Sequence, residues 1–176
     1  MPDADVNLYL DPVCPSAWMT SKWLRLVLAQ RDYAVDWRFI SLRLINANVD
    51  YDSHFPAGYE AGHTAGLRLL RVAARVRTEH GREAAGALYA AMGARIFDAP
   101  AGAGSGDGAL RGSRPFVEPI LTDAGLPAEL ADALDDPGYD AELRRETDEA
   151  LALTGKDVGT RSSTSARRTA SPSSGR

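Results

Sequence analysis

The sequence predicts an α/β fold in which a β-α-β unit at the start is followed by a long helical segment. Two stretches, 5–10 and 33–42, alternate apolar and polar residues, which is typical of strands. Between them, and again over 57–97, apolar residues recur every three or four positions, which is typical of helices. Strands separated by a helix favour a parallel sheet, so we expect the first 42 residues to form a β-α-β unit.

Each element of this unit has its own local signals. Asp11-Pro12 ends the first strand, and Pro15 suits the first turn of a helix that we expect to run to about Arg31. Apolar residues spaced three and four positions apart mark this helix. They are Met19, Trp23, Leu26 and Val27.

The segment after the second strand reads as a series of helices. We expect two helices within 57–97, broken near His80-Gly81. Small, flexible residues at 99–113 predict a loop. Helical patterns then return three times, and Gly155 is a candidate C-cap for the last helix. These stretches are 115–124, 127–134 and 138–154.

Composition excludes several classes of function. The net charge of −4 and the lack of a basic stripe argue against a nucleic-acid partner. No stretch resembles a secretory signal or a membrane span, so we expect a cytoplasmic protein without a membrane partner. One cysteine excludes an intramolecular disulfide and a Cys-rich zinc site. His54, His63 and His80 lack ligand-like spacing, so we expect no metal site and read each as a surface or core residue.

Cys14, the single cysteine, lies between the first predicted strand and the predicted helix. It directly precedes Pro15 in the stretch LDPVCPSAW. Backbone N–H groups and the positive end of the helix dipole favour a thiolate at such a position. A Cys-x-x-Cys motif would place a second thiol at position 17, which holds Ala17. The alternative is a buried cysteine that acts as a small hydrophobic residue.

The run from DPVCPSAW to INAN over residues 11–48 resembles DsbA-like thioredoxin-fold proteins of actinobacteria, especially the mycothiol-dependent nitroreductase type. Kappa-class glutathione transferases and hydroxychromene-carboxylate isomerases are related families. The resemblance continues through further motifs in the same order, and it covers roughly 5–160. These motifs are YEAGH at 59–63, LYAAMGARIF at 88–97, LTDAGLPAELADAL at 121–134 and GKDVGT at 155–160.

This resemblance implies a thioredoxin-like (DsbA-type) fold with an inserted α-helical domain. It assigns 1–45 to the N-terminal β-α-β half and 46–154 to the helical insertion and a return helix. It assigns 155–160 to the start of the C-terminal half of the fold, whose closing strands are missing from this sequence.

The resemblance also implies the activity of a thiol oxidoreductase with Cys14 as nucleophile and Pro15 beside it. It assigns substrate or thiol binding to a further set: Ser16, Trp18, Asn46, Tyr59 and Thr160. Because the motif Cys-Pro-Ser-Ala has one thiol, a mixed disulfide at Cys14 must be cleared by a second small thiol. We therefore expect mycothiol or a similar thiol as co-substrate, no tightly bound cofactor, and a small-molecule substrate.

Two other functions and one assembly stay open at this point. One alternative is a thiol transferase or isomerase of the same fold, which uses a bound thiol without redox turnover. The other is an inactive, truncated product whose helical domain only binds a partner. A homodimer is also left open.

The tail over 161–176 departs from the family pattern, which demands a cis-proline, two strands and a helix after GKDVGT. It contains six Ser and four Arg but no large apolar residue, so we expect it to be disordered and unable to form core strands. If its Arg and Ser codons are CGN and TCN, one C inserted after the Thr160 codon would encode proline at position 161, followed by strand-like residues. We therefore expect a frameshifted tail, with a natural disordered tail as the alternative.

Overall fold

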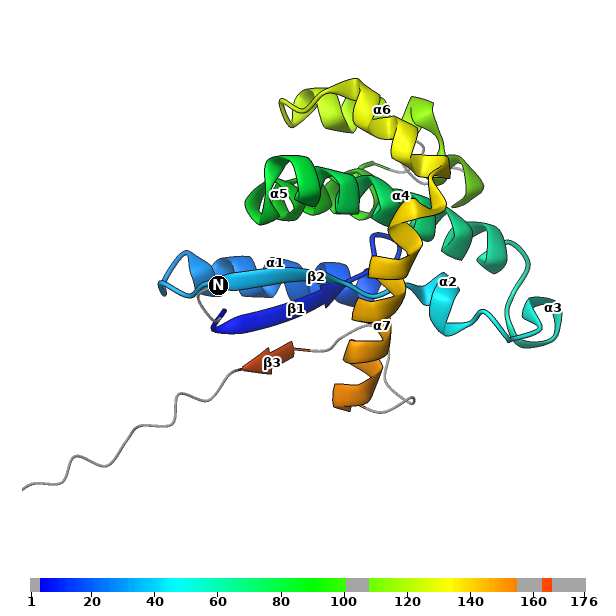
Figure 1. Cartoon of the computed structure of the whole chain (residues 1–176), viewed down its shortest axis with the longest axis horizontal. Helices are drawn as coiled ribbons and strands as arrows, with labels where there is room; N and C mark the ends of the chain where they lie inside the picture. Colours follow the sequence, from blue (N-terminus) through cyan, green and yellow to red (C-terminus); the bar gives the residue numbers. More distant parts are fainter. Residues whose placement is uncertain (1–3, 101–107, 155–162, 166–176) are drawn as a thin grey trace, which may run out of the picture.

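The computed structural model describes residues 4–100, 108–154 and 163–165, and it places a small sheet beside a larger group of helices (Figure 1). The elements of the first part are β1 (Val6–Leu10), α1 (Pro15–Leu28), β2 (Val35–Phe39), α2 (Leu42–Ile45) and α3 (Tyr51–His54). The elements of the helical part are α4 (Tyr59–His80), α5 (Arg82–Gly93), the π-helix η1 (Ala94–Asp98), the 3₁₀-helix η2 (Gly108–Gly112), α6 (Arg114–Asp123), the 3₁₀-helices η3 (Ala128–Asp135) and η4 (Pro137–Tyr139), and α7 (Asp140–Thr154). A short strand, β3 (Ser163–Ser165), follows.

The sheet has the strand order β2-β1-β3. β1 and β2 run parallel, with Val6 opposite Val35 and Leu10 opposite Phe39, as predicted for a β-α-β unit. β3 pairs antiparallel with the other edge of β1, with Ser163 opposite Leu8. The tail therefore pairs at the sheet edge over 163–165, where disorder was expected, whereas the expectation that it forms no core strands stays a prediction. Backbone groups alone make the ladder hydrogen bonds, so a Ser/Thr segment can join an edge without contributing to the core.

The rest of the tail, and Thr160 with it, lies outside the described residues. The expectations of a frameshift and of disorder after Arg161 therefore stay predictions. The thioredoxin-like assignment and the division at 45 and 154 also stay predictions, because the β-α-β unit and the helices that follow are compatible with them without establishing them.

The apolar residues that mark α1 as a helix are not the ones that it buries. Met19, Trp23 and Leu26 are 62–65% exposed, whereas Ala17, Trp18, Ser21 and Leu24 are buried. Both sets repeat at helical spacing, so periodicity alone does not choose between them. The choice depends on α5, where Gly93 leaves room for the Trp18 ring that a Cβ atom would overlap.

The helical part agrees with the prediction except at 108–112, where the 3₁₀-helix η2 lies within the predicted loop. α4 ends at His80 and α5 begins at Arg82, and between them Gly81 has a φ of 88° that glycine adopts readily. α6 continues through Pro119, and the predicted helix at 127–134 is the 3₁₀-helix η3. None of the helices in the described ranges is long and apolar enough to cross a membrane.

Two helices connect the helical part to the sheet. α7 returns across the end of β2, where the Glu146 carboxylate accepts the Phe39 N–H at 2.7 Å and the Thr147 hydroxyl accepts the Ser41 N–H at 3.1 Å. α5 packs against α1 through a core that contains Cys14, Trp18 and Tyr89. These contacts fix the carboxyl end of the sheet, from which the Cys14 turn emerges.

Candidate functional site

The turn that carries Cys14 is held by a buried carboxylate. Asp11 follows β1 and is fully buried, and its two oxygens accept the backbone N–H groups of Val13 at 2.9 Å and Leu42 at 2.8 Å. The Asp11 carbonyl also accepts the Cys14 N–H at 3.1 Å. Burial raises the pKa of Asp11 to about 6, against the lowering effect of the two backbone hydrogen bonds. Asp11 therefore ties the Cys14 turn to the end of β2.

Cys14 is the N-cap residue of α1. Its backbone is extended (φ −88°, ψ 112°), its carbonyl accepts the Trp18 N–H at 3.1 Å, and Pro15 occupies the first helical position. The side chain is 8% exposed. The thiol thus lies at the positive end of the 14-residue helix α1, as the sequence predicted, in surroundings that are largely dry.

One cavity of about 590 Å³ opens on the α4 side of this turn. Val13 and Pro15, which flank Cys14 in the chain, form part of its wall, and His63 and Arg111 supply its ionisable groups. The remaining lining residues are mainly small or apolar: Leu42, Ala57, Gly58, Tyr59, Gly62, Phe97 and Gly108. Its size and mixed lining suit a small organic ligand.

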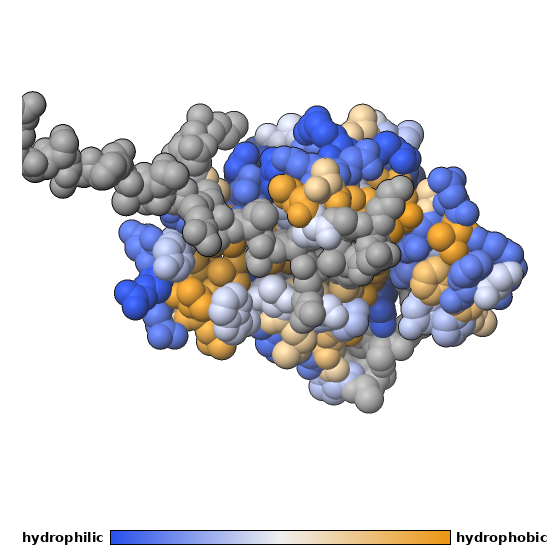
Figure 2. Space-filling view, turned by 90° about the horizontal axis from the view of Figure 1, so that it is seen from below, coloured by the Kyte–Doolittle hydropathy of each residue, from blue (hydrophilic) through white to orange (hydrophobic). Residues whose placement is uncertain are grey.

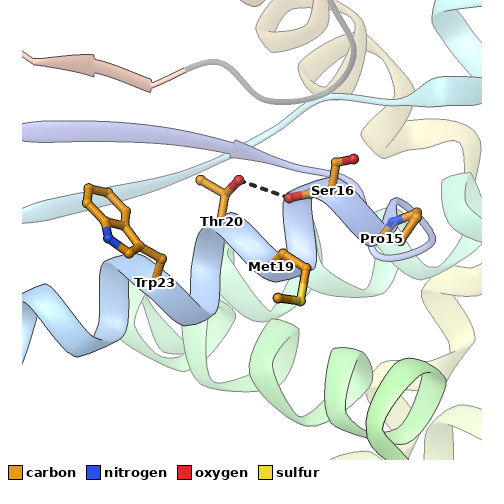
Figure 3. A pocket seen from close by; sticks show the side chains of 5 residues that line it. All are labelled: Pro15, Ser16, Met19, Thr20 and Trp23. Atoms are coloured by element: carbon orange, nitrogen blue, oxygen red, sulfur yellow. Dashed lines mark hydrogen bonds between the residues drawn. The ribbon is translucent and has the colours of Figure 1, made fainter.

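A shallow groove of about 480 Å³ follows the outer side of α1 (Figure 3). Pro15, Ser16, Met19, Thr20 and Trp23 line it, and the Thr20 hydroxyl donates to the Ser16 carbonyl at 2.9 Å. Apolar side chains are also visible on the face of the molecule seen from below (Figure 2). Pro15 borders both hollows, whereas Cys14, the residue before it, is buried and lines neither of them.

The structure brings some of the expected site residues together and separates others. Pro15 and Ser16 lie beside Cys14, and Tyr59 lines the 590 Å³ cavity. Trp18 is 5% exposed and lies in the core, with its Nε1 donating to Asp98 at 3.2 Å.

Asn46 caps α2 by donating its side-chain amide to the Leu42 carbonyl at 2.9 Å. Neither Trp18 nor Asn46 is among the lining residues of the two hollows, because each side chain is committed to a structural contact.

An aromatic cluster that the sequence did not reveal forms one side of the 590 Å³ cavity. Tyr59 stacks on Phe55 with ring centroids 5.6 Å apart, and His63 meets both rings edge-on. The Tyr51 hydroxyl and His63 Nδ1 are 2.9 Å apart. Burial, followed by the charge of Arg43, lowers the pKa of His63, so the ring is neutral at pH 7.

The expectation that His63 is merely a surface or core residue is therefore incomplete, because it also faces the cavity. The i, i+4 spacing of Tyr59 and His63 in YEAGH was the available signal. Among the described residues, no three His, Cys, Asp or Glu side chains gather in a way that could hold a metal ion.

Comparison with known proteins gives two matches. A family model named Rv2466c-like, with the description mycothiol-dependent nitroreductase Rv2466c, matches residues 13–166. An uncharacterized protein of Mycobacterium tuberculosis, Rv2286c, is 32% identical over 160 residues. That match covers 88% of this chain and 62% of the relative, so the chain spans less than two thirds of the relative's length.

Proposed function

We propose that Cys14 carries out thiol–disulfide chemistry with mycothiol, because this chain belongs to the Rv2466c-like family of mycothiol-dependent nitroreductases. Family membership makes the chain an oxidoreductase relative that depends on a small thiol. The DsbA-like fold, the one-thiol reaction and the site residues are our proposal beyond that.

The observation that carries the proposal is the position of Cys14 at the N-terminus of α1, directly before Pro15, which borders two hollows. The helix dipole stabilises a thiolate, which is the reactive form in disulfide exchange. The cavity with His63, Tyr59 and Arg111 offers hydrogen bonds suited to a sugar-containing thiol. The groove with Met19 and Trp23 offers an apolar surface suited to an aromatic or disulfide substrate.

The proposed cycle has two exchange steps. The Cys14 thiolate attacks a mixed disulfide between substrate and mycothiol, forms a Cys14–mycothiol disulfide, and releases the substrate as a thiolate. A second mycothiol thiolate then attacks the mycothiol sulfur of that disulfide, which restores the Cys14 thiolate and yields mycothiol disulfide. Overall, the mixed disulfide and one mycothiol thiolate become the substrate thiolate and mycothiol disulfide, so the substrate sulfur is reduced as the incoming mycothiol sulfur is oxidised.

The single cysteine supports this one-thiol cycle over a two-thiol one, because Ala17 occupies the place of a resolving thiol. For a nitro-aromatic substrate the same balance holds: two mycothiols become mycothiol disulfide, and the nitro group is reduced to nitroso with release of water. A conjugating enzyme would instead join mycothiol to the substrate and form no mycothiol disulfide.

The test supplies mycothiol with either a nitro-aromatic probe or a mixed disulfide probe and measures mycothiol disulfide by chromatography. We expect disulfide formation to match probe reduction one to one, and the Cys14→Ser variant to lose at least 100-fold in rate. A Thr122→Ser variant, changed on α6 outside both hollows but keeping its hydroxyl, is the control. Undiminished turnover by Cys14→Ser, or a mycothiol adduct without disulfide, would rule out the cycle.

A further inference from the structure

Tyr89 on α5 places a phenol group in the core beside the Cys14 turn. The residue is 5% exposed, and its hydroxyl makes no hydrogen bond of good geometry with the part of the chain that the structure describes. A buried tyrosine hydroxyl usually has a partner, because leaving it unpaired costs about 1–3 kcal/mol. The groups around the Tyr89 hydroxyl must therefore explain why it is buried without a hydrogen bond of good geometry to the described residues.

The surroundings connect Tyr89 to the start of α1. Tyr89 shares a core cluster with Cys14, and its ring packs against Trp18, with centroids 6.1 Å apart and a tilt of 55°. Trp18 is one helical turn after Cys14, to whose carbonyl its N–H donates. The phenol is thus held by packing at the turn of helix that follows the thiol.

The ionisable groups around Tyr89 leave it as a proton donor. Burial raises the pKa of Tyr89, and the charges of Asp11 and Cys14 raise it further, whereas Arg25 lowers it. At neutral pH the phenol therefore keeps its proton and faces two groups that carry negative charge when ionised. Arg25 itself is committed elsewhere, donating to the Gly86 carbonyl at 2.7 Å.

We infer that Tyr89 is a positioning residue for Cys14, whose thiolate is stabilised by a hydrogen bond from the Tyr89 hydroxyl. The inference rests on the proposed function in taking Cys14 as the nucleophile. A hydrogen bond to a charged acceptor is among the stronger ones in proteins. The hydrogen bond stabilises the thiolate and not the neutral thiol. It therefore changes how the reaction rate depends on pH, and not only the rate itself.

Ser21 is the competing explanation. Its hydroxyl donates to the Trp18 carbonyl at 2.8 Å and is near enough to Tyr89 to affect its protonation. If the Tyr89 hydroxyl interacted only with Ser21, the phenol would contribute to packing and would not affect the reactivity of the Cys14 thiol. The other charged groups that act on Tyr89 are Asp11 in the Cys14 turn and Arg25 on α1, and both stay unchanged in the test.

The test measures the rate of Cys14 alkylation by iodoacetamide from pH 5.5 to 10 in the wild type, Tyr89→Phe and Ser21→Ala. We expect Tyr89→Phe to react about tenfold more slowly than wild type at pH 6.5, with rates within twofold at pH 10. Ser21→Ala is expected to follow the wild-type curve. Thermal unfolding of each variant confirms that the fold is retained.

Two results would overturn the inference. One is a Tyr89→Phe curve that runs parallel to the wild type at every pH, which would mean a packing role only. The other is a Ser21→Ala curve displaced as far as that of Tyr89→Phe. Alkylation needs neither mycothiol nor a substrate. The role of Tyr89 can therefore be confirmed even if the proposed cycle is ruled out, and it can be ruled out even if the cycle is confirmed.

Discussion

Arg77 of α4 donates to Glu146 of α7 across 2.8 Å, and Glu146 is only 4% exposed. The second carboxylate oxygen of Glu146 accepts the Phe39 N–H at 2.7 Å, and the Arg77 guanidinium lies 4.0 Å from the centroid of the Phe39 ring. One ion pair thus joins two helices of the helical part to the end of β2. It fixes the sheet end from which the Cys14 turn departs.

Removing one partner of this pair is expected to destabilise the protein strongly. Glu146→Ala leaves Arg77 largely buried with only part of its charge paired, so we expect a loss of about 3 kcal/mol in the free energy of unfolding. Glu79→Ala is the matched control, since it removes an exposed i, i+4 partner of Arg75 and should cost under about 0.5 kcal/mol. Urea unfolding measures the free energy of unfolding of both variants. Equal losses in the two would contradict the claim that the buried ion pair contributes more than the exposed one.

Asp11 makes a pH-dependent contribution to stability that can be isolated with Asp11→Asn. Its pKa is about 6 in the folded protein and about 3.8 in the unfolded chain, so the folded state binds the proton more tightly. Its contribution is therefore fully present below pH 3.8 and is lost as the pH rises through 6. We expect the stability of wild type relative to Asp11→Asn to fall by about 2–3 kcal/mol between pH 4 and pH 7.

Urea unfolding of both proteins at a series of pH values checks this, and the other titrating groups cancel in the difference. A difference that stays constant with pH would show that burial does not perturb Asp11. A difference that grows with pH would show that its two backbone hydrogen bonds outweigh burial.

The sequence predicts local features of this fold well, because they depend on neighbouring residues. The alternation in β1 and β2, the break at Gly81 and the helix start at Pro15 each depend on a few adjacent positions, and the structure has all three. The buried face of α1 could not be predicted in this way, because two sets of residues share the helical period and the choice between them depends on Gly93, which is 75 positions after Trp18.

The residues of the candidate site also fall into those predictable from neighbouring positions and those that depend on tertiary packing. Cys14 and Pro15 are adjacent in sequence, and their place at a helix start could be predicted. Tyr51, His63 and Tyr89 reach the site only through the packing of α3, α4 and α5, which no pattern local to Cys14 predicts. Trp18 looked like a site residue because it is near Cys14 in sequence, but helix geometry turns it toward α5.

Trp18 and Trp23 offer a direct test of the face that α1 buries. Trp18 is 5% exposed and packs on Tyr89 and Phe97, whereas Trp23 is 62% exposed. We expect Trp18→Ala to lower the free energy of unfolding by about 3–5 kcal/mol and Trp23→Ala to change it by less than about 0.5 kcal/mol. The predicted order would be reversed if Met19, Trp23 and Leu26 formed the buried face, and equilibrium unfolding distinguishes the two cases.

Tyr59 and Tyr33 test whether the 590 Å³ cavity binds the thiol co-substrate. Both side chains are 47% exposed, but only Tyr59 lines the cavity, where its ring stacks on Phe55. A ring contact contributes about 0.5–1.5 kcal/mol, so we expect Tyr59→Ala to raise the KM for mycothiol about five- to tenfold.

Because Tyr59 is a wall residue of the cavity and takes no part in the exchange steps proposed for Cys14, kcat should stay within about twofold. Tyr33→Ala should leave both constants unchanged. An equal rise in KM for Tyr33→Ala would point to a general loss of structure. A fall in kcat with unchanged KM in Tyr59→Ala would mean that the ring acts on the reacting sulfur and not on binding, and the thiol would then have to enter from the α1 groove beside Ser16 and Met19.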